Sequence, residues 1–277
     1  MTAKSDPKEI SALVRELLES GSRGVLVTLI DGGTNNLRVG AKLIVNESGV
    51  RQGSFGQEAL EEAVVRHALN FLKTRDDAKA FQVVQFAPDL TEFAKTTILF
   101  ERIEAEPRLI VAGAGHVGAS LARLAALIGY RVTLIDDRAE FVDRKLFSMQ
   151  EEEAIELVSA HDWQAALRHA IGNGRGVAVA IVTRGHKQDE ECLRAAMETD
   201  PDYVGMIGSR RRTNIVLDKL REEGANDVQL RKVRAPIGLD IGAVSPEEVA
   251  LAILAEIVAE RRGGSGTPLS DWRRTQS

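Results

Sequence analysis

The segment LIVAGAGHVGASLARLAALIGYRVTLIDD, residues 109–137, carries the strongest information about the fold of this chain. An apolar run ends in Gly113, Gly115 and Gly118, which form the pattern GxGxxG, and apolar residues at helical spacing follow. In a strand–turn–helix unit, the first two glycines permit a tight turn and a close approach of the backbone to phosphate. The third glycine lets the helix pack against the strand. The segment therefore predicts a phosphate-binding turn of the Rossmann type.

Residues around this turn add candidate ligand contacts. His116 lies inside the turn, where it either contacts a phosphate or a ring or only caps the helix, and Val117 follows it. Free N–H groups at such a helix start attract anions. Asp136 stands at the end of the next predicted strand, where an acidic side chain can accept hydrogen bonds from a ribose diol. The alternative is a tight strand–helix turn that binds nothing.

Strand and helix patterns alternate from residue 106 onward, which is typical of a parallel sheet covered on both faces. We therefore predict an α/β fold with a Rossmann-like domain over residues 106–262. The expected strands are residues 109–113, 131–136, 176–183 and 203–208, and the expected helices are residues 115–128, 162–171, 188–198 and 210–223.

Two further polar segments, residues 183–186 and 208–212, follow predicted strands. They fall at the carboxyl edge of the sheet, where open α/β sheets bind ligands. Serine and arginine at a helix start predict a second anion site there. The candidate contacts in the two segments are His186, Gly208, Ser209 and Arg210. The neighbouring Arg211 and Arg212 are expected to lie on a solvated helix face.

Residues 1–105 are predicted to form a separate, smaller domain of the α/β or α+β class, because Glu106-Pro107 interrupts the pattern. This domain shows no evident chemistry of its own. The expected helices are residues 7–20 and 57–73, and the expected strands are residues 24–30, 41–49, 81–86 and 96–103.

The last predicted helix begins at residues 245–248, whose sequence SPEE is typical of a capping box. Val249, Ile253 and Ile257 form an apolar stripe on it, which packs either within the chain or against a second copy. Residues 263–277 are polar and rich in glycine, and we expect this tail to be mobile.

The composition narrows the possible functions. A net charge of −5 disfavours a nucleic-acid binder, and no apolar run approaches the ~20 residues of a membrane span. The start MTAKSDPKEI has no apolar segment of a signal peptide, so a cytoplasmic location is expected. The chain has no nucleophile elbow, HExxH or Walker A lysine. We therefore predict no catalytic residue and no metal ligand.

Five motifs of the chain are GAGHVG (113–118), IDDR (135–138), TRGHKQD (183–189), YVGMIGSRRR (203–212) and APIGLDIGAVSPEEVALAILAEIVA (235–259). Together they resemble the XdhC/CoxI family, whose members are accessory proteins for molybdenum hydroxylases such as xanthine dehydrogenase and carbon monoxide dehydrogenase. The resemblance implies a Rossmann-like C-terminal domain behind a separate N-terminal domain. It also implies binding of molybdenum cofactor, as molybdopterin or its dinucleotide form, and help in its maturation, sulfuration or insertion.

The implied partners are a molybdenum hydroxylase apoenzyme, a cysteine desulfurase and a second copy of the chain in a homodimer. Two other functions stay open at this point. The pattern GxGxxG with Asp136 favours an NAD(P)-dependent oxidoreductase, although no acid–base pair for hydride chemistry accompanies it. The altered N-terminal segments favour a non-catalytic bridging protein with a vestigial nucleotide site.

The N-terminal half resembles the same family with departures in GGTNNLRVGAKLIV (32–45) and GSFGQEALE (53–61). Ala59 stands where the family has a cysteine, and a thiol is the natural group to carry a persulfide or to ligate molybdenum. The altered positions are Asn36, Val39, Gln57, Glu58 and Ala59. These departures argue against a direct sulfur-relay role for this segment.

Cys192, the single cysteine, excludes an internal disulfide and is expected to be a structural residue. Asp189, Glu190 and Glu191 precede it, and their charges are expected to raise the pKa of its thiol. Relocation of the family's sulfur chemistry to Cys192 is therefore the less favoured alternative.

Overall fold

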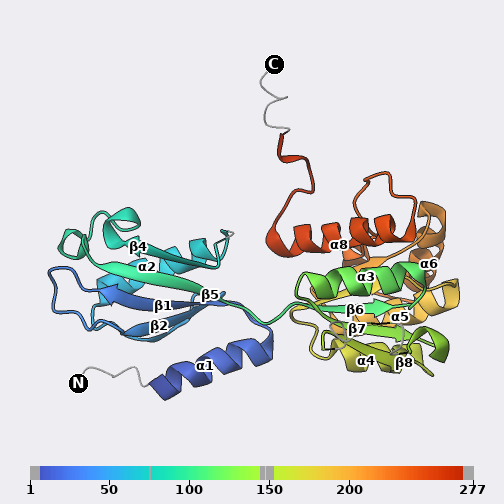
Figure 1. The fold of residues 1–277 in the computed structure, drawn as a ribbon, viewed down its shortest axis with the longest axis horizontal. Helices are drawn as coiled ribbons and strands as arrows, with labels where there is room; N and C mark the ends of the chain where they lie inside the picture. The colour runs from blue at the N-terminus through green and yellow to red at the C-terminus, as the bar shows by residue number, and fades with distance from the viewer. Residues whose placement is uncertain (1–6, 75, 144–146, 148–152, 271–277) are drawn as a thin grey trace. The chain divides into compact units, whose positions relative to one another are not determined.

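The computed structural model describes residues 7–74, 76–143, 147 and 153–270 (Figure 1). The chain divides into two compact units, Met1–Ala105 and Glu106–Ser277. Each unit has its own layer of strands and its own hydrophobic core.

The N-terminal unit is an antiparallel sheet with the strand order β3-β2-β1-β5-β4, and it is therefore of the α+β class. Its elements are α1 (Pro7–Ser20), β1 (Gly24–Asp31), β2 (Lys42–Asn46), β3 (Arg51–Gly53), α2 (Glu58–Phe71), β4 (Ala78–Gln82), η1 (Val83–Gln85), η2 (Thr91–Phe93) and β5 (Thr97–Ile103). Buried residues of α2, among them Leu60 and Phe71, pack on buried residues of β1, β2 and β5.

Two strand predictions in this unit are wrong in part. The strand expected over residues 81–86 ends at Gln82, because Gln82 and Gln85 form a reciprocal capping box that begins the 3₁₀ helix η1. The strand expected over residues 41–49 ends at Asn46. The side chain of Asn46 accepts hydrogen bonds from the N–H groups of Ser48 and Val50 and turns the chain into β3.

The C-terminal unit is a parallel sheet with the strand order β10-β9-β6-β7-β8, and the predicted α/β Rossmann class is confirmed. Its strands are β6 (Arg108–Ala112), β7 (Arg131–Asp136), β8 (Ile155–Ser159), β9 (Val177–Ile181) and β10 (Tyr203–Met206). The order of the strands reverses between β6 and β9. In folds of this kind, that reversal marks the place where ligands bind.

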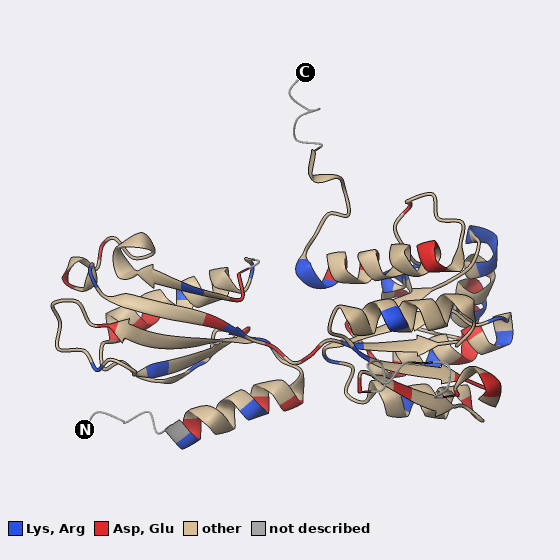
Figure 2. Cartoon of the chain, in the orientation of Figure 1, with Lys and Arg blue, Asp and Glu red and all other residues tan. Residues whose placement is uncertain are grey.

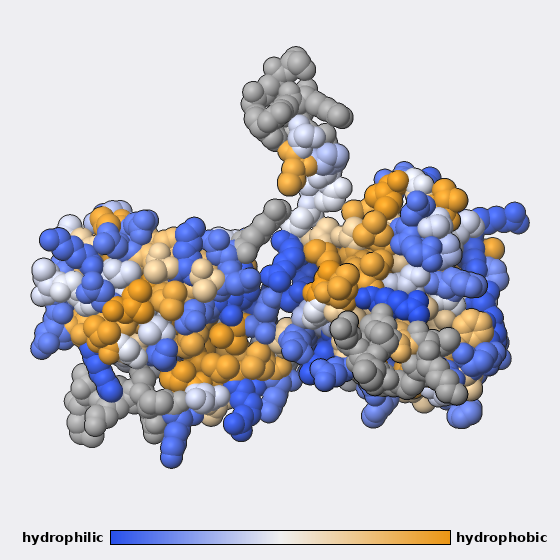
Figure 3. Space-filling view, viewed as in Figure 1, coloured by the Kyte–Doolittle hydropathy of each residue, from blue (hydrophilic) through white to orange (hydrophobic). Residues whose placement is uncertain are grey.

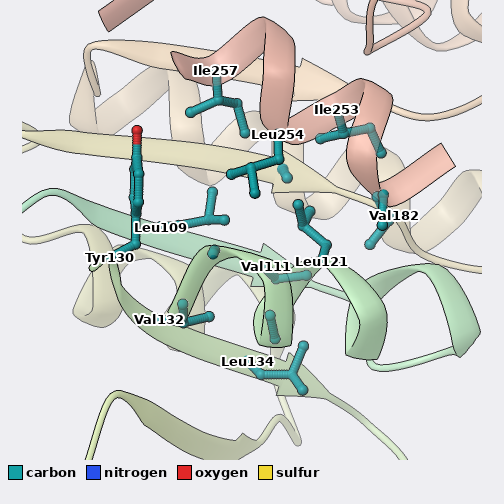
Figure 4. Packing of buried hydrophobic residues seen from close by; sticks show 14 of the residues in the cluster. Leu109, Val111, Leu121, Tyr130, Val132, Leu134, Val182, Ile253, Leu254 and Ile257 are labelled. Carbon is teal, nitrogen blue, oxygen red and sulfur yellow. The ribbon is translucent and has the colours of Figure 1, made fainter. Parts of the chain in front are cut away.

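Helices cover both faces of this sheet. One face packs against α3 (His116–Leu127) and α8 (Pro246–Arg262), and the other against α4 (Trp163–Ile171), α5 (His186–Thr199), α6 (Arg210–Glu222) and α7 (Asp227–Lys232). A short 3₁₀ helix, η3 (Ala139–Phe141), follows β7. Figure 4 shows how Leu121 of α3 and Ile253 of α8 pack on the strand residues Leu109 and Val111.

The last helix confirms the predicted cap. The Ser245 hydroxyl accepts a hydrogen bond from the N–H of Glu248, and the Glu248 carboxylate accepts one from the N–H of Ser245. Ile253 and Ile257 are buried in the core shared with α3, and Val249 is packed against it. The apolar stripe therefore serves packing within the chain. The homodimer stays a prediction, and this stripe does not support it.

The C-terminal tail is described only in part. Gly263 ends α8 in the left-handed conformation, and residues 271–277 of the predicted mobile segment 263–277 lie outside the described residues. The mobility of residues 263–270 stays a prediction.

Charged residues of both signs are spread over both units (Figure 2), and the face drawn in Figure 3 mixes hydrophilic with hydrophobic surface. In the described part of the chain, no helix combines the length and the apolar character that crossing a membrane requires.

Candidate functional site

A cavity of about 210 Å³ lies at the carboxyl edge of the parallel sheet in the C-terminal unit. Its walls come from the end of β7, from the segments that follow β6, β7 and β9, and from the first turns of α4 and α5. Four predicted residues line it: Gly113, Gly115, His116 and Asp136. The structure therefore brings the glycine turn and the end of β7 together, at the place where the strand order reverses.

The three glycines of the turn have different reasons to be glycine. Gly113 has φ of +110°, and a Cβ atom on it would lie 2.6 Å from the carbonyl oxygen of Val182. A Cβ atom on Gly118 would lie 1.8 Å from the carbonyl oxygen of Gly113. Gly115 has an ordinary φ of −64°, and nothing lies within 4 Å of a Cβ atom built on it. Gly113 and Gly118 thus serve packing, whereas Gly115 leaves room for a ligand.

Two helices that border the cavity begin without a side-chain cap. α3 follows Gly115 and α5 follows Gly185, and neither glycine has a side chain that could accept a hydrogen bond from the first N–H groups of its helix. By contrast, Asp162 caps α4 and Ser209 caps α6. Uncapped helix starts favour an anion. The cavity is therefore suited to a negatively charged group.

Asp136 is already engaged within the protein. Its side chain is buried, and its two oxygens accept hydrogen bonds from the N–H of Ala114 at 2.7 Å, from the N–H of Arg138 at 3.0 Å and from the Arg138 guanidinium at 2.8 and 2.9 Å. That guanidinium also lies 3.7 Å from the centre of the Phe141 ring. The carboxylate thus fixes the glycine turn to the end of β7. The predicted contact with a ribose diol would first have to displace Arg138.

The charges on this pair are stable near neutral pH. Burial by itself raises the pKa of Asp136, but the hydrogen bonds from Arg138 and from the N–H of Ala114 hold it below its usual range. The same contact with Asp136 raises the pKa of Arg138. The pair therefore presents little net charge to the cavity.

A second ion pair joins the two loops that flank the glycine turn. Arg184, which follows β9, donates from Nη2 to Oδ2 of Asp137, which follows β7, at 2.9 Å. Both residues line the cavity, and the side chain of Arg184 is 51% exposed. Asp137 lies in the motif IDDR and Arg184 in the motif TRGHKQD. Each residue directly follows a strand of the parallel sheet, and this position was the signal in the sequence that could have placed both at the ligand-binding edge.

The other predicted contacts lie outside the lining of the cavity. His186 is the exposed first residue of α5, and the segment Gly208–Arg210 follows β10. The Ser209 hydroxyl accepts a hydrogen bond from the N–H of Arg212 at 3.3 Å and caps α6. The residues that the structure does not place in the cavity are Val117, Gly118, His186, Gly208, Ser209 and Arg210.

The prediction of a solvated Arg212 is wrong, because this side chain reaches a buried carboxylate on α5. Its Nη2 atom lies 2.5 Å from Oδ2 of Asp189, which is fully buried and also accepts a hydrogen bond from the Thr183 hydroxyl at 2.5 Å. Burial raises the pKa of Asp189, and the bonds from Thr183 and Arg212 oppose that rise. Arg211 is exposed, as predicted. Thr183 lines the cavity, and Arg212 therefore contacts a cavity residue indirectly, through Asp189.

Cys192 is a core residue of α5. Burial, and then the charges of Asp189 and Glu191, raise the pKa of its thiol well above the ordinary value. The third predicted charge, Glu190, instead pairs with Arg194 and Lys219. The thiol is therefore held in its unreactive form.

We expect Cys192→Ala to leave ligand binding unchanged within about twofold, because the side chain lies in the core and away from the cavity. Incubation of the native protein with a cysteine desulfurase and cysteine should leave no persulfide on Cys192 in intact-mass spectra. A persulfide at high occupancy, together with lost activation of a target enzyme in Cys192→Ala, would make this chain a sulfur carrier.

The altered N-terminal motif keeps an ordered loop. Glu61 is buried and its Oε1 atom accepts hydrogen bonds from the hydroxyl of Ser54 and from the N–H groups of Phe55 and Gly56 at 2.6–3.0 Å. Ala59 lies exposed in the first turn of α2. The position where the resemblance implies a cysteine is thus accessible but carries a methyl group.

Comparisons with known proteins match both units of the chain. Residues 109–257 match the XdhC Rossmann domain, and residues 17–86 match the XdhC and CoxI family. A probable component of xanthine dehydrogenase in Bacillus subtilis (strain 168) is 32% identical over 174 residues, which cover 62% of this chain and 49% of that protein.

YqeB of Escherichia coli (strain K12) is 27% identical over 255 residues, which cover 91% of this chain and 46% of that protein. The molybdenum cofactor insertion chaperone PaoD of Escherichia coli (strain K12) is 33% identical over 84 residues, which cover 30% of this chain and 26% of PaoD. The chain spans about half the length of YqeB and of the Bacillus subtilis protein.

A crystal structure described as a xanthine dehydrogenase from Bacillus halodurans has the same fold. It superposes with a TM-score of 0.63 at 21% identity, and the match covers 93% of this chain and 68% of that one.

Proposed function

The chain belongs to the XdhC and CoxI family, and we propose that it binds molybdenum cofactor and assists its maturation or its insertion into a molybdenum hydroxylase. One observation carries this proposal: the cavity where the strand order reverses is bordered by the uncapped start of α3, beside the open Gly115. The cofactor carries a phosphate in both its molybdopterin and its dinucleotide form. A phosphate is the kind of group that such a helix start binds.

The residues of the cavity fit the phosphate and the ring of this cofactor. Arg184 and the N–H groups of α3 would hold the phosphate, and the flat side chains of Phe141, Trp163 and His116 would contact the pterin. A cavity of about 210 Å³ is smaller than the ~300–1,000 Å³ of typical ligand sites. We therefore propose that part of the cofactor extends beyond this cavity.

The molybdenum end of the cofactor would receive few or no ligands from the described residues of this chain. In the described ranges, no group of three or more histidine, cysteine, aspartate or glutamate side chains is placed to hold a metal ion, and the thiol of Cys192 is buried. When bound, the cofactor would carry the molybdenum centre that the target enzyme uses. The role of this chain's residues would be to hold the organic part and to release it.

The proposed partner is a molybdenum hydroxylase apoenzyme, in keeping with the names of PaoD and of the Bacillus subtilis relative. A cysteine desulfurase is a weaker proposal, because Ala59 replaces the family's cysteine. The NAD(P)-dependent oxidoreductase remains a second candidate on the pattern GxGxxG alone. Its ribose acceptor, Asp136, is engaged by Arg138 and Ala114.

The test is to produce the protein in a host that makes molybdenum cofactor, purify it gently and identify what it retains. We expect a pterin, detected by fluorescence after oxidation and by mass spectrometry, at close to one per chain, and no pterin on Gly115→Asp. A retained NAD(P) in place of the pterin would favour the oxidoreductase. A wild-type protein that retains no pterin and takes up none when it is supplied would contradict the proposal.

A further inference from the structure

The ion pair between Asp137 and Arg184 occupies part of the proposed ligand site. It spans from the end of β7 to the end of β9, the two strands on either side of β6, whose end carries the glycine turn. Both side chains line the cavity, and both are partly exposed. An anion that reaches the start of α3 therefore meets a guanidinium that already has a carboxylate partner.

We propose, resting on the function proposed above, that Asp137 is an internal competitor for the anionic group of the ligand. In the ligand-free cavity its carboxylate holds Arg184, and on binding a phosphate takes that guanidinium over. Arginine binds phosphate through two parallel hydrogen bonds, whereas the pair with Asp137 is joined by a hydrogen bond of 2.9 Å from Nη2. The exchange is favourable because partly exposed ion pairs contribute little to stability.

The neighbouring charges single out Asp137 for this role. Asp136 is buried and bonded to Arg138, so neither of these two side chains is available to exchange with a ligand. Oδ1 of Asp137 lies 3.9 Å from Nε of Arg138, which is beyond hydrogen-bonding distance. Asp137 is thus held in place mainly by Arg184, and it is the carboxylate that a phosphate displaces.

The arrangement suits a protein that hands its ligand on. A carboxylate that recaptures Arg184 assists the departure of a phosphate, and it keeps the affinity below the value that the cationic site alone would give. Removing the carboxylate should therefore strengthen binding and slow release.

The test uses inorganic pyrophosphate as the probe, with affinities measured by ³¹P NMR titration of the full chain. We expect Asp137→Asn to bind pyrophosphate roughly three- to tenfold more tightly than the wild type. Arg184→Gln should bind it more weakly. In the Arg184→Gln background, Asp137→Asn should bring almost no further gain, because the competitor has then lost the group for which it competes.

Glu140→Gln is the matched control, since it removes one exposed negative charge from η3, in the same segment after β7, and Glu140 is not part of the pair. One contrary result is that Glu140→Gln raises the affinity for pyrophosphate as much as Asp137→Asn does, and another is that Asp137→Asn raises it equally in the Arg184→Gln background. Either result would show that the effect comes from net charge alone and would overturn the proposal. Absence of any gain would overturn it as well. Wild-type binding that Gly115→Asp removes, with no gain in Asp137→Asn, would keep the proposed site and refute the competitor. If none of these folded proteins bound pyrophosphate, the assignment of an anion site to this cavity would be refuted.

Discussion

Replacing Gly115 with aspartate is expected to lower the affinity for a phosphate-bearing cofactor at least tenfold, or about 1.4 kcal/mol, while the protein stays folded. The new carboxylate would repel the anion and fill the open space next to the start of α3. The fold should tolerate the change, because φ at this position is −64° and no atom lies within 4 Å of the added Cβ. Calorimetry of cofactor binding and denaturant unfolding would measure the two effects separately.

Gly118→Ala is the control for a glycine of the same turn that serves packing and not ligand binding. The added Cβ atom would lie 1.8 Å from the carbonyl oxygen of Gly113, so we expect the free energy of unfolding to fall by at least the ~1–3 kcal/mol of an overpacked core. Equal cofactor affinity in a folded Gly115→Asp protein would show that the cavity has been assigned wrongly.

Arg212→Met is expected to destabilise the C-terminal unit by about 2–3 kcal/mol. The substitution leaves the carboxylate of Asp189 buried with only the Thr183 hydroxyl as its bonded partner, and uncompensated buried charges are costly. The side chain of Arg212 is 26% exposed, which keeps the expected loss below the ~3–5 kcal/mol of a fully buried pair. Arg211→Met is the control, because its exposed side chain should change the free energy of unfolding by less than about 0.5 kcal/mol.

The loss should depend on pH in a defined direction. Burial raises the pKa of Asp189 in the folded protein above its unfolded value, so folding favours the protonated carboxyl. The stability that this group contributes is present below the unfolded pKa and is lost as the pH rises through the folded pKa. Removing Arg212 takes away a charge that lowers this pKa. Arg212→Met should therefore be less destabilised at pH 5 than at pH 8, and equal losses at the two values would contradict the assignment.

The parallel sheet was predictable because its central strands are almost continuously apolar. β8 was missed for the opposite reason: it is an edge strand in which the exposed Glu156 follows the buried Ile155. In the N-terminal unit, the end of β4 depends on hydrogen bonds between two glutamine side chains, which hydrophobic periodicity does not register.

The candidate site was predictable only as far as the chain order determines it. The glycine turn and Asp136 lie in the expected place because consecutive strands of a parallel sheet end at one edge. What Asp136 contacts was not predictable, because Arg138 folds back onto it through side-chain torsions. Arg211 and Arg212 are adjacent in sequence, and only the rotation of α6 relative to Asp189 separates their environments.

The packing of α8 against α3 means that the C-terminal unit cannot complete its core during synthesis before α8 has been made. The core that supports α3 includes Ile253, Leu254 and Ile257, which lie in α8, the last helix that the structure describes in this unit. Until residues 246–262 have emerged, Leu121 and its neighbours on that face of the sheet lack their cover. A nascent chain that ends before α8 should therefore remain sensitive to proteolysis in its C-terminal unit, and the ligand cavity should become competent only once α8 has been synthesised.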